Sequence, residues 1–196
     1  MNIQTATDVA RRLNELISRL IEAESDLDAR MFDIWRGMTA GSTAQGSWQN
    51  RKGKIAEDIV KGIIRQHLRD QQLIVADSSN ETSDLLIDGR SIRYGSEPDI
   101  ALYSATEEIL AAVEVKGGID AAGVLERIGA ALKSLSRAKY ENPQATTVLL
   151  MYRVAMTEQA RQELEAHRLQ IDYWFTLEDV LNRDASRQRI YQLLAI

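Results

Sequence analysis

The sequence predicts an α/β fold in which helices flank a mixed central β-sheet, with an additional helical layer at the N-terminus. Strands alternate with helices across residues 108–175, which is the pattern of βαβ units. Residues 146–152, TTVLLMY, form a near-continuous apolar run that is typical of a strand covered on both faces. Because the 196 residues contain no clear linker, we expect a single domain over 1–196.

Composition narrows the class of protein. No apolar run approaches the roughly 18 residues of a membrane span, and the N-terminus lacks the apolar core of a signal peptide, so we expect a cytoplasmic protein with no membrane partner. The absence of cysteine excludes disulfides, thiolate nucleophiles and cysteine metal sites. The net charge of −5 counts only weakly against a nucleic-acid partner, since divalent cations bound by active-site carboxylates would reverse the charge locally.

Periodicity places the elements along the chain. Residues 6–38 have helical spacing and form the predicted N-terminal layer, 1–40, and a polar loop at 40–53 precedes a helix at 51–69. On that helix Ile55, Ile59, Ile63, Ile64 and Leu68 share one side, and Glu57 lies at the edge of the apolar stripe. The other predicted elements are a strand at 73–75, a hairpin of 85–87 and 92–94 around Asp88-Gly89, a helix at 120–139 capped by Asp120, the strand 146–152, a helix at 157–167, a strand at 169–175 and mostly helix from 176 to the end.

Residues 97–118 are predicted to form two half-buried strands joined by a turn near Ala105-Thr106. Apolar residues alternate with others through Ile100 and Leu102, and again through Val113 and Val115. If the loop is even-numbered, these four side chains point into the core. Asp99, Glu114 and Lys116 then share the other face, with Asp99 lying diagonally across the ladder from the other two.

Two carboxylates and an ammonium on one rigid face have the chemistry of phosphodiester hydrolysis. Asp99 and Glu114 supply the hard oxygen ligands that suit Mg²⁺ with several retained waters. Lys116 could orient the attacking water or stabilise the transition state, and Glu57 could add a metal ligand or hold a metal-bound water. The simpler alternative is a surface ion pair between Lys116 and one of the two acids, worth at most about 1 kcal/mol.

The pattern Pro98-Asp99, fourteen intervening residues and Glu114-Val115-Lys116 resembles the motif of the PD-(D/E)xK nuclease superfamily. The resemblance covers about residues 51–155, which would form a restriction-endonuclease-like core, with 156–196 as a C-terminal α/β extension. The superfamily's first core helix often supplies an acid, which here is Glu57 or its neighbour Asp58, with helical spacing favouring Glu57. Within the superfamily, a compact chain of this size most resembles type II restriction endonucleases. That resemblance implies Mg²⁺-dependent cleavage of double-stranded DNA, usually by a homodimer.

Groove readout uses Arg, Lys, Asn and Gln side chains on loops. The candidate DNA contacts precede the Glu57 helix or follow the buried strand: Gln45, Gln49, Asn50, Arg51, Lys52, Lys54 and Arg153. Trp48 could stack against a base or simply pack in the fold.

Two alternatives to a restriction endonuclease stay open. One is a repair, recombination or junction-resolving nuclease of the same superfamily, which the −5 charge disfavours, and the other is a non-enzymatic interaction module.

Overall fold

The computed structural model describes residues 51, 53–75, 82–118 and 123–196, together with residues 11, 12, 14 and 18, which are helical. The chain divides into two compact units, Met1–Ser47 and Trp48–Ile196. The rest of the predicted helical layer over 1–40 lies outside the described residues. None of the helices in the described part combines the length and apolar content needed to cross a membrane.

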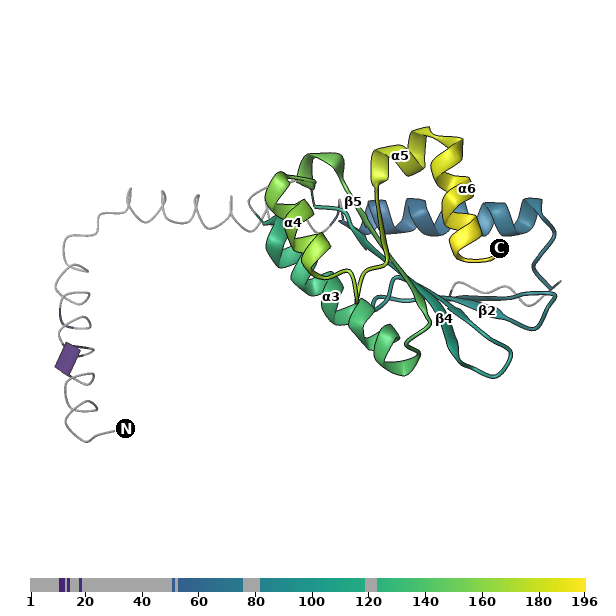
Figure 1. Ribbon diagram of the computed structural model, residues 1–196, viewed down its shortest axis with the longest axis horizontal. Coiled ribbons are helices and arrows are strands. Elements are labelled where there is room, and N and C mark those ends of the chain that lie inside the picture. The colour runs from purple at the N-terminus through teal and green to yellow at the C-terminus, as the bar shows by residue number, and fades with distance from the viewer. Residues whose placement is uncertain are drawn as a thin grey trace. The chain divides into compact units, whose positions relative to one another are not determined.

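Six strands form one mixed sheet in the order in which they occur along the chain, which confirms the predicted fold class (Figure 1). The first four strands pair antiparallel, and the fourth, fifth and sixth pair parallel. The strands are β1 (Ser83–Leu85), β2 (Ser91–Tyr94), β3 (Ile100–Tyr103), β4 (Ile109–Lys116), β5 (Thr146–Met151) and β6 (Tyr173–Thr176).

Helices cover both faces of this sheet. A helix over residues 53–70 packs on one face together with α5 (Leu177–Asn182) and α6 (Asp184–Leu193), and α3 (Val124–Glu141) and α4 (Glu158–Ala166) pack on the other (Figure 1). A short 3₁₀ turn, η1 (Arg153–Ala155), follows β5. Each side has its own apolar core, so the sheet is the middle layer of three.

Strand β4 is the clearest departure from the sequence prediction. The alternation of Val113 and Val115 predicts a half-buried strand, but β4 is buried on both faces. The valines belong to the core under helix 53–70, whereas Ala112 belongs to the core under α3. Small alanines carry little apolar signal in a sequence, so the second buried face was not predicted. Glu114 is therefore enclosed by protein rather than lying on a solvated face.

Four further predictions need correction. On helix 53–70 the buried stripe is Ala56, Val60, Ile64 and Leu68, while Ile55 and Ile59 are exposed. The predicted strand 73–75 is a single bridge between Ile74 and Leu86. Helix α3 begins at Val124 with Gly123 as its N-cap, and Asp120 lies outside the described residues. Strand β6 begins at Tyr173, because residues 167–170 form a hydrogen-bonded turn after α4. In the first case the side of the helix that carries Ala56 faces the sheet, because Gly117 at the end of β4 lies directly against Ala56 and Gly53.

Candidate active site at the open end of the β3–β4 hairpin

The register of β3 and β4 brings the two predicted acids together. Ile100 pairs with Val113, so the preceding residue, Asp99, falls opposite Glu114 and on the same face. Asp99 therefore lies directly across the ladder from Glu114, whereas the sequence analysis predicts a diagonal position. The loop 104–108 is odd-numbered, but the register shifts between Leu102 and Tyr103, and this bulge restores the parity that an even loop would have given.

Asp99 is held in place by two hydrogen bonds and is 2% exposed. Its Oδ2 accepts the Val115 N–H at 2.7 Å, and its backbone oxygen accepts the Gly95 N–H at 3.0 Å. Burial raises the pKa of Asp99 to about 7, and the negative charges of Glu114 and Glu57 add to the effect, which the Val115 N–H and Lys116 oppose. A carboxyl in this environment favours a nearby cation when it ionises.

Glu114 is 1% exposed and has only one of its two oxygens satisfied. Lys116 Nζ donates to Oε1 at 2.5 Å, whereas Oε2 is buried with no hydrogen-bond partner among the described residues. A buried carboxylate oxygen without a partner is costly, and such groups are rare in folded proteins. A cation bound beside this oxygen would offset that cost.

The start of helix 53–70 abuts the end of β4, which brings Glu57 near the two carboxylates. A Cβ on Gly117 would lie 2.8 Å from both the Ala56 side chain and the Gly53 backbone, so only glycine permits this approach. The charge of Glu57 contributes to the raised pKa of Asp99, whereas Asp58 is exposed and forms an ion pair with Lys54 at 3.7 Å. Of the two neighbouring acids, Glu57 is therefore the one that acts on the site.

The donor set fits Mg²⁺ held by few protein ligands. No three acidic or histidine side chains in the described part of the chain converge closely enough to hold a metal ion together. Mg²⁺ is usually bound through one or two carboxylates and keeps several waters, so the facing pair Asp99 and Glu114 is sufficient. Glu57 would then act through a metal-bound water rather than as a direct ligand.

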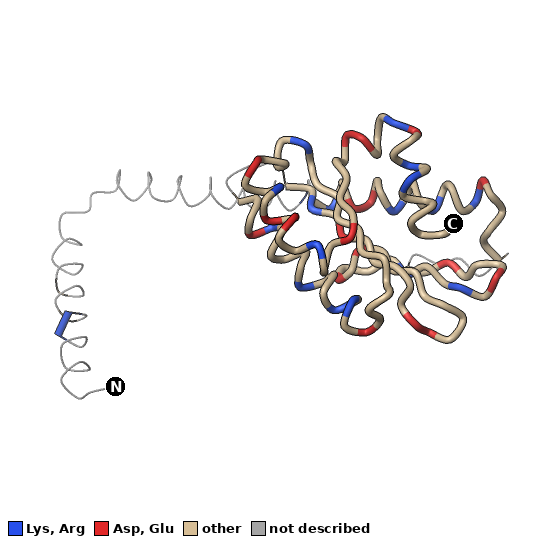
Figure 2. The backbone as a smooth tube through the Cα atoms, in the orientation of Figure 1, with Lys and Arg blue, Asp and Glu red and all other residues tan. Residues whose placement is uncertain are grey.

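The predicted DNA contacts are only partly described. Arg51 and Lys54 are exposed at the start of the helix, while Gln45, Trp48, Gln49, Asn50 and Lys52 lie outside the described residues. Arg153 is tied to the neighbouring α5, since its guanidinium donates to Asp179 and its backbone N–H donates to Glu178, both at 2.8 Å. Acidic and basic residues are interspersed along the described backbone (Figure 2).

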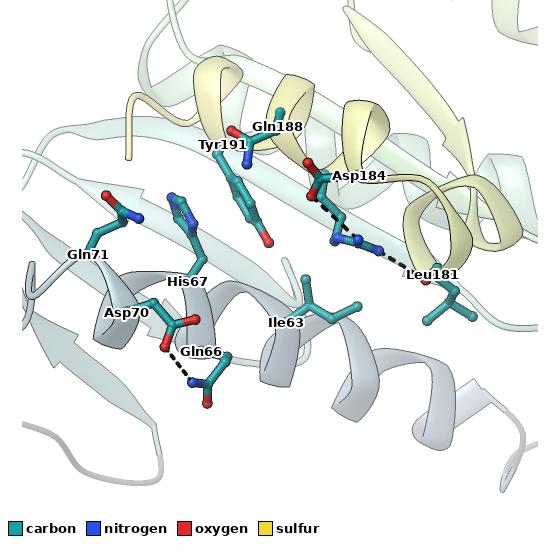
Figure 3. Close-up of a pocket in the computed structure, with 10 residues that line it drawn as sticks. Ile63, Gln66, His67, Asp70, Gln71, Leu181, Asp184, Gln188 and Tyr191 are labelled. Atoms are coloured by element: carbon teal, nitrogen blue, oxygen red, sulfur yellow. Dashed lines mark hydrogen bonds and ion pairs between the residues drawn. The ribbon is translucent and has the colours of Figure 1, made fainter.

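A separate pocket of about 450 Å³ lies between helix 53–70 and α6 (Figure 3). The His67 ring stacks on Tyr191 with centroids 3.6 Å apart and planes 6° from parallel. The acidic side chains that line the pocket have hydrogen-bond partners nearby, since Asp184 accepts from Arg187 and Asp70 accepts from Gln66. None of the predicted site residues lines this pocket, so we place the candidate active site at the carboxylates.

The sequence prediction did not identify two hydrogen bonds that helix 53–70 makes to distant segments of the chain. Lys61 donates to the Gly95 backbone oxygen at 2.8 Å, and Arg65 donates to Asp84 at 2.9 Å. The sequence does contain a signal, because Glu57, Lys61 and Arg65 are spaced four residues apart and so share one side of the helix.

One of the comparisons with known proteins identifies a family. A family model described as XcyI restriction endonuclease matches residues 3–186 of the chain. The matched range includes Glu57, Asp99, Glu114 and Lys116. A search of curated proteins found no match.

Proposed function

Because the chain belongs to the XcyI restriction endonuclease family and is thus a nuclease that acts on DNA, we propose that it is a type II restriction endonuclease that cuts double-stranded DNA at a specific sequence with Mg²⁺. The observation that carries the proposal is the buried Oε2 of Glu114, which lies opposite Asp99 and has no partner in the part of the chain that the structure describes. A purely structural ion pair with Lys116 would leave no reason to bury that second oxygen unsatisfied.

In this proposal Asp99 and Glu114 would hold Mg²⁺, which when bound supplies a lowered pKa for a coordinated water and neutralises charge on the phosphate. Lys116, held by Glu114 Oε1 at 2.5 Å, directs its ammonium at the scissile phosphate and stabilises the negative charge that develops there. Glu57 orients water at the edge of the site. The Val115 N–H keeps Asp99 Oδ2 fixed, so its other oxygen can face the ligand.

The DNA-contacting residues of the proposed enzyme lie on the segment leading into helix 53–70 and after β5. Arg51 and Lys54 at the helix start would contact phosphates close to Glu57, where positive charge offsets the carboxylates. A homodimer would place two such sites on a palindromic sequence, one for each strand. We propose that the enzyme acts in the cytoplasm. The proposed contacts are Gln49, Asn50, Arg51, Lys52, Lys54 and Arg153.

The test is cleavage of unmethylated phage and plasmid DNA by the purified full chain, with Mg²⁺ or with EDTA. We expect discrete fragments with 5′-phosphate ends in Mg²⁺, and no cleavage in EDTA or by Glu114→Ala. Indiscriminate nicking, or cutting only at branched DNA, would instead support the repair or junction-resolving alternative. Cleavage that persists undiminished in EDTA would contradict the metal-dependent site.

A further inference from the structure

Three charged residues on one side of helix 53–70 act on successive positions of β2 and of the segment that follows it. The charge of Glu57 acts on Asp99, and one turn later Lys61 Nζ donates to the Gly95 backbone oxygen at 2.8 Å. A further turn along, the Arg65 guanidinium lies 4.3 Å from the centre of the Tyr94 ring, over its face. The helix therefore contacts both Tyr94, the last residue of β2, and the residue that follows it.

The segment that begins at Gly95 is a tight turn that ends at Asp99. The Gly95 N–H donates to the Asp99 backbone oxygen at 3.0 Å, which closes the turn. A Cβ on Gly95 would lie 3.2 Å from the Pro98 oxygen, so the turn has little room for a side chain at this position. A shift of Gly95 would therefore move Asp99 with it.

Asp99 needs such a restraint because its surroundings push it away. It faces Glu114, another buried carboxylate, and two like charges at directly opposed positions of a ladder repel each other. The Val115 N–H restrains the Asp99 side chain. The main-chain turn that carries Asp99 is held separately, by the hydrogen bond from Lys61 to the Gly95 oxygen. An ammonium-to-carbonyl hydrogen bond is charge-assisted and hence stronger than a neutral one.

We propose that Lys61 is a positioning residue, which fixes the turn carrying Asp99 to the helix carrying Glu57 and so sets the distance between these two acids. The proposal rests on the proposed nuclease function. The ammonium already donates to a protein carbonyl, and the residue contributes by holding Asp99 rather than by contacting phosphate.

The test compares Lys61→Met, which keeps the aliphatic stem without the ammonium, with Lys61→Arg, which keeps a charged donor. Lys133→Ala is the matched control, since Lys133 contacts the same turn through the Glu97 side chain, in an ion pair at 3.5 Å, and not through the main chain. We measure amide hydrogen exchange over residues 95–99 without DNA. We also measure single-turnover cleavage at saturating DNA, and DNA affinity with Ca²⁺ in place of Mg²⁺.

For Lys61→Met we expect several-fold faster exchange over 95–99 and single-turnover cleavage slower by about 10- to 100-fold, with DNA affinity within about threefold of the parent. Lys61→Arg should recover most of the rate, and Lys133→Ala should match the parent. Unchanged exchange in Lys61→Met would overturn the proposal, as would weaker DNA binding with the salt slope lower by about 1 at an unchanged saturated rate. If the parent cuts no DNA, the nuclease proposal fails, while the exchange measurement still decides the role of Lys61.

Discussion

Asp84 and Glu114 are buried acids of the same sheet with opposite surroundings. Asp84, on β1, is 0% exposed, and its Oδ2 accepts from the Arg65 guanidinium at 2.9 Å and from the Tyr94 hydroxyl at 2.8 Å. Glu114, on β4, is 1% exposed and bonds Lys116 through one oxygen, while its other oxygen has no partner in the described part of the chain. Each acid pairs with a cation, so burial and charge pairing alone do not distinguish them.

The difference lies in what surrounds the pair. Arg65 also stacks over the Tyr94 ring, so the Asp84 cluster is satisfied as an anchor between helix and sheet. Glu114 instead faces a second carboxyl, Asp99, whose pKa burial raises to about 7, with the charge of Glu114 adding to the effect. Acids forced together at the end of a strand are costly without a ligand, and perturbed carboxyls of this kind concentrate at functional sites. In our proposal the first acid supports the fold and the second forms part of the active site.

The largest effect should come from substituting Glu114 or its partner Lys116. Glu114→Ala and Lys116→Ala should each slow DNA cleavage by about 10⁴-fold, on the order of 5 kcal/mol in activation free energy, because one removes a proposed metal ligand and the other the charge beside it. Single-turnover cleavage measures the effect, with circular dichroism to check the fold. Cutting by either variant at the parent rate would remove that residue from the site.

A substitution in the Asp84 cluster should instead change the stability of the fold. Arg65→Met removes the cation from the buried Asp84 carboxylate and should lower the free energy of unfolding by about 4 kcal/mol. Urea denaturation measures it. Arg137→Met, which breaks only an exposed pair with Glu141, is the control and should change stability by less than about 0.5 kcal/mol. If both variants unfolded at the same urea concentration, the Asp84 cluster would not be an anchor.

The same contrast explains how much the sequence could predict. The order of strands and helices followed from periodicity and turn residues, and the same-face grouping of Asp99, Glu114 and Lys116 followed from strand parity. The bulge after Leu102 is not visible in the sequence, and parity held only because it offsets the odd-numbered loop.

The remaining site features depend on contacts between distant segments. The burial of Glu114 results from α3 covering the second face of β4, and its alanine-rich lining gave no strong apolar pattern. The bond from Lys61 to Gly95 joins residues 34 positions apart. In a sequence Lys61 is one more surface lysine, and only the fold shows what its ammonium contacts.

The raised pKa of Asp99 predicts how the stability of the protein depends on pH. The folded pKa of about 7 exceeds the unfolded value of 3.8, so the folded state binds this proton more tightly. The stability of the metal-free protein should therefore be full below about pH 4 and fall as pH rises to about 7.

Asp99→Asn keeps an oxygen to accept the Val115 N–H and removes the charge. In EDTA at pH 8 it should be more stable than the parent by about 3 kcal/mol, less than the shift alone converts to because the buried amide also loses water. Urea denaturation at pH 4 and pH 8 measures the difference. Equal pH dependence in parent and variant would assign the titration to another group.

The smallest effect should come from Glu57, which acts on the site from the helix rather than from the β3–β4 hairpin. Glu57→Gln keeps the shape and hydrogen-bonding capacity of the side chain, so single-turnover cleavage should slow by about 10-fold, or ~1.4 kcal/mol, and more Mg²⁺ should be needed for half-maximal rate. Asp58→Asn is the control, since Asp58 is exposed and pairs with Lys54. A larger loss in Asp58→Asn than in Glu57→Gln would make Asp58 the helical acid of the site.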